Sequence, residues 1–117
     1  MNATTILAIL LIVAFATLGS AKVAAVPSMR ARAQHVGFSA AAYRRIGFLE
    51  LLAVGGLLLG AYLPVIGALA AAGLLALLGG AAVTHVRNGD GLREVAPSVV
   101  LALASLGYLA LVLGDLR

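Results

Sequence analysis

The sequence predicts an all-α integral membrane protein, built as one bundle of four transmembrane helices over residues 1–117. Of these residues, 63% are hydrophobic and only 10% are charged, and the mean hydropathy is +1.14. A water-soluble domain does not keep such a balance. The apolar runs are also about 20 residues long, which is the length of helix that crosses the hydrocarbon core of a bilayer. The chain therefore has room for four spans and little room for an extramembrane domain.

The first span is expected over residues 4–26 and ends before Pro27. A cleaved secretory signal is the weaker interpretation, because no basic residue precedes this run and its apolar core is long. A basic connection follows, in which residues 28–35 are expected to form a short interfacial helix. Ser39 is then a suitable N-cap for the second helix.

Turn residues place the other three spans. The second span is expected over residues 43–62, and a short link that ends with Pro64 separates it from the third, residues 65–86. These two spans should form a tight antiparallel hairpin. Asn-Gly and Asp-Gly pairs mark the next link as a turn, and the fourth span is expected over residues 96–114, with Pro97 in its first turn.

The distribution of basic residues predicts the orientation. Seven of the eight lysines and arginines flank the first and third links, and cytoplasmic loops carry such an excess. Both termini should therefore be extracytoplasmic. The net charge of +4 is explained by orientation and by contact with lipid headgroups, so nucleic-acid binding is not expected. The seven residues are Lys22, Arg30, Arg32, Arg44, Arg45, Arg87 and Arg93, against Arg117 at the other side.

Several chemistries are excluded by composition. The chain has no cysteine, so it forms no disulfide, thiolate metal site or iron–sulfur cluster by itself. No zinc-ligand spacing, nucleophile elbow or phosphate loop occurs, and no metal site is expected. A bis-histidine haem would need His35 and His85 at matched depth in the bundle, whereas His35 is expected in a loop.

Small residues are expected to bring the helices close together. Glycine and alanine spaced four positions apart allow close approach of transmembrane backbones, although this spacing indicates packing and says nothing of chemistry. The helix-packing candidates are Gly56 with Gly60, and Gly67 with Ala71.

A layer of polar side chains is predicted near the cytoplasmic ends of the spans. Glu50 lies about one to two turns inside the second span, too deep to reach water easily. Lys22 lies at a comparable depth near the end of the first span, so an ion pair is available, and His85 comes from the same side. The candidates for ligand binding or proton relay are Lys22, Glu50 and His85, with Ser98, Ser105 and Tyr108 from the fourth span.

Each titratable group also has a purely structural explanation. Lys22 can extend its ammonium to the interface, and His85 is favourable at the carboxyl end of a helix dipole. The pair of Lys22 and Glu50 can fix helix register without any further function. The aromatic residues Tyr43, Phe48 and Tyr62 are expected to be interface anchors.

The arrangement resembles the DoxX-like family of small bacterial four-helix membrane proteins. The matching stretches are "GSAKVAAVP", "RRIGFLELLAVGGLLLG" and "YLPVIGALAAAGLLALLGGAAVTHV". The resemblance implies the bacterial inner membrane and points to Lys22, Glu50 and His85 as the polar positions of interest. It also implies an association with membrane redox systems, quinone reduction among them.

Three functions remain open. The first is a small accessory or redox-associated subunit, not expected to be an enzyme on its own, whose polar layer would bind a quinone ring. The second is a proton-coupled exporter of small molecules. The argument against it is that a cationic substrate would have to compete with Lys22 for Glu50. The third is a structural scaffold in a larger membrane complex or a homo-oligomer, with partners on its glycine-rich faces.

Overall fold

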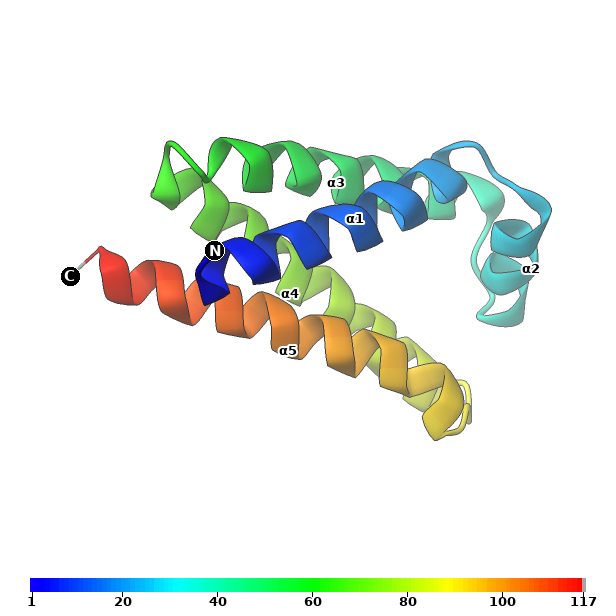
Figure 1. Ribbon diagram of the computed structural model, residues 1–117. Helices are drawn as coiled ribbons and strands as arrows, with labels where there is room; N and C mark the ends of the chain where they lie inside the picture. The colour runs from blue at the N-terminus through cyan, green and yellow to red at the C-terminus, as the bar shows by residue number, and fades with distance from the viewer. Residues whose placement is uncertain (117) are drawn as a thin grey trace.

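The computed structural model describes residues 1–116, which form five helices and no strand (Figure 1). This confirms the all-α prediction for the described part of the chain. The helices are α1 (Ala3–Val23), α2 (Pro27–His35), α3 (Ala40–Leu59), α4 (Pro64–Arg87) and α5 (Leu92–Asp115).

Three helices, α1, α4 and α5, are long and apolar enough to cross a membrane. The chain is therefore a helical membrane protein in contact with lipid. The remaining long helix, α3, has 20 residues, but any stretch of it long enough to span includes Arg44, Arg45 and Glu50. Its charge sets α3 apart from the other three, so the fourth span stays a prediction.

Local signals fix the starts of several helices. The side chain of Asn2 accepts a hydrogen bond from the Thr5 amide at 2.9 Å, and Ser39 Oγ accepts one from the Ala42 amide at 3.0 Å. Pro64 lies in the first turn of α4, where a missing N–H costs nothing. The short helix expected over residues 28–35 is present as α2. The predicted cap at Ser39 is likewise confirmed.

The start of α5 differs from the expectation. The helix begins at Leu92, four residues before the expected span, so Pro97 lies inside it rather than in its first turn. Glu94 in the first turn favours this earlier start, because a carboxylate stabilises the positive end of the helix dipole. The extra turn brings Arg93 and Glu94 into an ordered helix beside α4.

The long helices form two pairs, with α1 packed along α3 and α4 packed along α5. The two pairs meet near the chain termini and diverge toward the end that carries α2 (Figure 1). At the closed end the backbones touch, since a Cβ added to Gly60 would lie 2.8 Å from the Cα of Gly67. The core around this contact includes Leu57, Ala71 and Leu74, all buried. The divergence leaves space between the pairs at the other end.

Close contact also joins α1 to α3 near the open end. A Cβ added to Gly47 would lie 2.8 Å from the carbonyl oxygen of Gly19 and 2.7 Å from the Cβ of Lys22. Only glycine at position 47 allows these two backbones to approach so closely. The contact places the last turn of α1 directly against the turn of α3 that carries Glu50.

Candidate functional site

An ion pair between α1 and α3 lies in the open end of the bundle. Lys22 Nζ donates to both carboxylate oxygens of Glu50, at 2.9 Å to Oε1 and 3.0 Å to Oε2. The Glu50 side chain is 5% exposed and that of Lys22 is 14% exposed. A carboxylate so enclosed needs a partner, because removing an unpaired charge from water costs several kcal/mol. The close approach at Gly47 supplies that partner.

Tyr43 adds a second contact to the ammonium. Its ring centroid lies 5.3 Å from Lys22 Nζ, within the range of a cation–π interaction. Tyr43 is two turns before Glu50 on α3, so both residues face α1. The ring of Phe38 packs edge-on against Tyr43, with centroids 6.1 Å apart.

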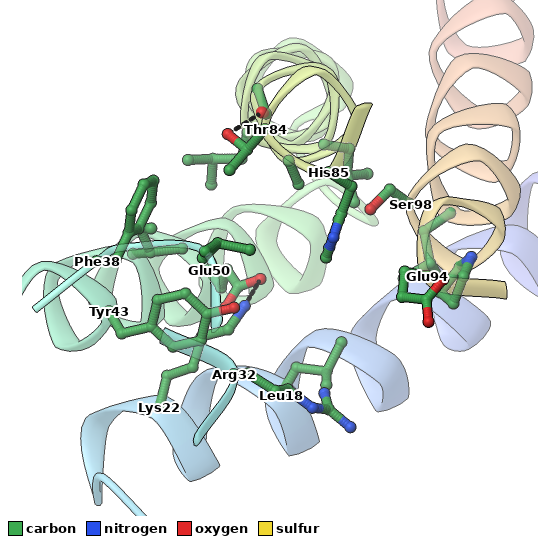
Figure 2. Close-up of a pocket in the computed structure, with 18 of the residues that line it drawn as sticks. Leu18, Lys22, Arg32, Phe38, Tyr43, Glu50, Thr84, His85, Glu94 and Ser98 are labelled. Atoms are coloured by element: carbon green, nitrogen blue, oxygen red, sulfur yellow. Dashed lines mark hydrogen bonds and ion pairs between the residues drawn. The ribbon is translucent and has the colours of Figure 1, made fainter. Parts of the chain in front are cut away.

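The ion pair forms part of the wall of a cavity of about 900 Å³ between the two helix pairs. Figure 2 shows Lys22, Glu50 and Tyr43 on one side of this space and His85 with Ser98 on the other. The size falls in the range of pockets that hold small molecules, roughly 300–1,000 Å³. The wall is largely apolar, and its apolar members include Phe15, Leu18, Ile46, Leu77 and Leu101.

The charged side chains around the cavity carry a net positive charge. Lys22, Arg32 and Arg93 carry positive charge, whereas Glu50 and Glu94 carry negative charge. Because Glu50 is already neutralised by Lys22, the remaining field comes mainly from the two arginines and Glu94. A neutral or anionic ligand fits this field better than a cation.

His85 lines the same cavity but hydrogen-bonds elsewhere. Its Nδ1 lies 2.6 Å from Asp90 Oδ2, and His35 Nε2 lies 2.8 Å from Asp90 Oδ1. Asn88 Nδ2 donates to Asp90 Oδ1 at 3.1 Å and to the His35 carbonyl at 3.2 Å. Asp90 thus joins the end of α2 to the end of α4.

The hydrogen bond from His85 lowers the pKa of Asp90, and those from His35 and Asn88 lower it further, against the raising effect of burial. Asp90 is therefore an ionised carboxylate at neutral pH. Sequence reasoning missed this residue, since its Asp-Gly pair was sufficiently explained by a turn. The sequence signal for this contact was the position of Asp90, five residues after His85, since a tight turn can return a side chain to the end of the preceding helix.

The three polar candidates of the fourth span are not brought together. Ser98, 8% exposed, lines the cavity. Ser105 is fully buried and donates to the Leu101 carbonyl at 2.9 Å, so its hydrogen is used within α5. The Tyr108 hydroxyl packs against Gly60 and Gly67 at the closed end. Only Ser98 of these three shares a space with Lys22, Glu50 and His85.

Among residues 1–116, no group of three histidine, aspartate or glutamate side chains is arranged to hold a metal ion. The cluster around Asp90 is an internal hydrogen-bond network, in which each imidazole bonds a different carboxylate oxygen. The polar side chains of the cavity wall offer hydrogen-bond donors and acceptors to a ligand.

A comparison with protein families returns a match to the model of the DoxX-like family over residues 6–108. The chain belongs to the DoxX-like family. The match spans most of the chain and includes Lys22, Glu50, His85 and Asp90. The searches of curated proteins and of solved structures found no match to this DoxX-like protein.

Proposed function

We propose that this DoxX-like protein crosses the bacterial inner membrane four times, with α3 as the fourth span and both termini extracytoplasmic. Several features support α3 as a span: it packs along α1 and α4, Arg44 and Arg45 lie near its basic end, and Glu50 is neutralised by Lys22. The seven basic residues in the described part all belong to segments at the α2 end, which fits a cytoplasmic face (Figure 1).

We further propose that the cavity binds the polar ring of an isoprenoid quinone, and that the protein serves as a small accessory subunit of a membrane redox system. The observation that carries this proposal is the buried pair of Lys22 and Glu50 in the wall of a large, mostly apolar cavity. An amphiphile with a neutral polar ring matches such a wall at both its polar and its apolar parts.

The available donors suit a quinone ring. An ammonium group has three N–H donors, and Lys22 uses its bonds to Glu50 without exhausting them. The remaining donor and the Tyr43 hydroxyl can serve ring carbonyl oxygens, which only accept. Apolar residues such as Leu77 and Leu101 can cover the ring and the start of an isoprenoid tail.

Export of a cationic substrate fits the cavity less well. A cation would have to displace Lys22 from Glu50, and Arg32 and Arg93 in the cavity wall would repel it. A structural scaffold is the second candidate, and the observation that favours it is the pair itself: each charge is satisfied by the other without a ligand.

The test is analysis by mass spectrometry of the quinones that copurify with gently solubilised protein. Wild type is compared with Glu50→Gln and with the control Asp115→Asn, which changes a carboxylate at the opposite end of the bundle. We expect about one quinone per chain in wild type and in the control, and loss of it in Glu50→Gln. Ordinary phospholipid alone in all three folded proteins would reject the quinone proposal and leave the scaffold.

A further inference from the structure

The turn between α4 and α5 is built to return Asp90 to His85. Gly89 has φ +76°, a left-handed conformation that glycine adopts without strain, and the Asp90 amide donates to the His85 carbonyl at 3.0 Å. The Asp90 side chain is 7% exposed and meets two imidazoles and one amide. Such a set of contacts fixes the carboxylate firmly although it lies in a loop.

The ionised carboxylate of Asp90 determines where the hydrogens of the two histidines lie. An ionised carboxylate only accepts hydrogen bonds, so His85 Nδ1 and His35 Nε2 must each carry a hydrogen. When His85 is neutral, its Nε2 then holds a lone pair. In the described part of the chain, no protein group is hydrogen-bonded to this Nε2.

The free nitrogen belongs to a ring that lines the cavity. The His85 side chain is 23% exposed, and Figure 2 shows it extending from α4 into the space that faces Glu50. The orientation resembles the general arrangement in which a carboxylate holds one imidazole nitrogen and leaves the other available to a reacting or bound group. Nε2 is therefore a hydrogen-bond acceptor on the cavity wall, beside the acceptor carboxylates of Glu50 and Glu94, and Glu50 is already bonded to Lys22.

We propose that Asp90 is a positioning residue that holds His85 in the Nδ1–H form, so that Nε2 accepts a hydrogen bond from a hydroxyl of the ligand ring. The ligand this selects is the reduced, hydroxyl-bearing ring, a hydroquinone, in preference to the quinone, which has no hydrogen to donate. The choice of ring rests on the proposed function, whereas the role of Asp90 toward His85 does not.

The role of Asp90 is tested on ligand-free protein by ¹⁵N nuclear magnetic resonance of labelled histidine. We expect the His85 signals of an Nδ1–H imidazole in wild type and in His35→Ala, which keeps the bond between His85 and Asp90. Asp90→Ala should lose this signature. Asp90→Asn keeps the size of the side chain but has one acceptor oxygen, so at least one of the two histidines should change form. An unchanged His85 spectrum in both Asp90 variants would overturn the inference.

The choice of ring is tested by anaerobic titration of a short-chain hydroquinone and of the matching quinone. We expect wild type to bind the hydroquinone about 5- to 10-fold more tightly than the quinone, which is the contribution of one hydrogen bond to affinity. In Asp90→Ala this preference should disappear while the quinone affinity is kept. Equal affinities in wild type would overturn the selectivity and leave the proposed function standing. Binding of neither ring would overturn the proposed function, with the role of Asp90 decided by the magnetic resonance result.

Discussion

Lys22 and Glu50 hold each other through both carboxylate oxygens, at 2.9 and 3.0 Å, across the contact between α1 and α3. The pair is possible because Gly47 lets the two backbones approach to contact one turn before Glu50. A ligand in the adjacent cavity thus meets a pair that is neutral overall but strongly dipolar. The same two residues contribute to stability and to the chemistry of the wall, and the two contributions can be separated by substitution.

Breaking the pair from one side should destabilise the protein. Lys22→Met leaves the buried carboxylate of Glu50 without its partner, and an uncompensated buried charge costs about 3–5 kcal/mol. The free energy of unfolding, measured by denaturant titration in micelles, should fall by that order.

Replacing both partners should restore most of the stability. In Lys22→Met/Glu50→Leu neither charge remains, and apolar residues of similar size often replace a buried pair at little cost. We expect the free energy of unfolding of this double variant to lie within about 1 kcal/mol of the wild-type value. The bound quinone should be lost. A double variant as unstable as the sum of the two single variants would show that the pair is not coupled.

Two glycines of α3 should respond oppositely to the same change. A Cβ at Gly47 would approach the Gly19 carbonyl to 2.8 Å, so Gly47→Ala must push α1 away and weaken the contact of Lys22 with Glu50. Gly55 has open space around it, and Gly55→Ala should stabilise the helix by up to about 1 kcal/mol. Thermal unfolding of both variants in one detergent checks this, and an equal response would contradict the backbone contact.

The stabilising effect of Asp90 should depend on acid pH. Its pKa lies below the usual value for aspartate, chiefly because His85 donates a hydrogen bond to it, with His35 and Asn88 as the other facing groups. A carboxylate with a lowered pKa stabilises the fold above its unfolded pKa and loses this effect as the pH falls through its folded pKa. The difference in melting temperature between wild type and Asp90→Asn should therefore be full near neutral pH and shrink below about pH 3.9. A difference that does not change with acidification would contradict the assigned charge.

Much of the fold follows from short-range signals in the sequence. Ser39 caps α3 and Pro64 begins α4 because capping and proline geometry depend only on neighbouring residues. The partnership of Lys22 and Glu50 followed from topology, since two helices joined by a single connection place their adjoining ends on the same face of the membrane. The early start of α5 was missed because proline is most favourable in the first turn of a helix, whereas Pro97 lies inside α5.

The cluster around Asp90 could not be predicted in the same way. His35 and Asp90 are 55 positions apart, and their contact depends on how α2 folds back toward the turn between α4 and α5. Neither local propensity nor the hydropathy pattern contains that information. The cavity is similarly a product of the angle between the two helix pairs, which depends on small residues at the closed end such as Gly60 and Gly67.

The proposed four-span topology can be tested with single cysteines, because the chain has none of its own. Ser28→Cys places a thiol at the exposed start of α2, and Tyr62→Cys places one in the exposed turn between α3 and α4. If α3 spans with its basic end in the cytoplasm, a membrane-impermeant maleimide added to intact spheroplasts should label Tyr62→Cys at once. It should label Ser28→Cys only after the membrane is permeabilised. Labelling of both thiols, or of neither, before permeabilisation would place the two ends of α3 on one side. That result would reject α3 as a span and would remove the membrane setting in which Glu50 requires Lys22.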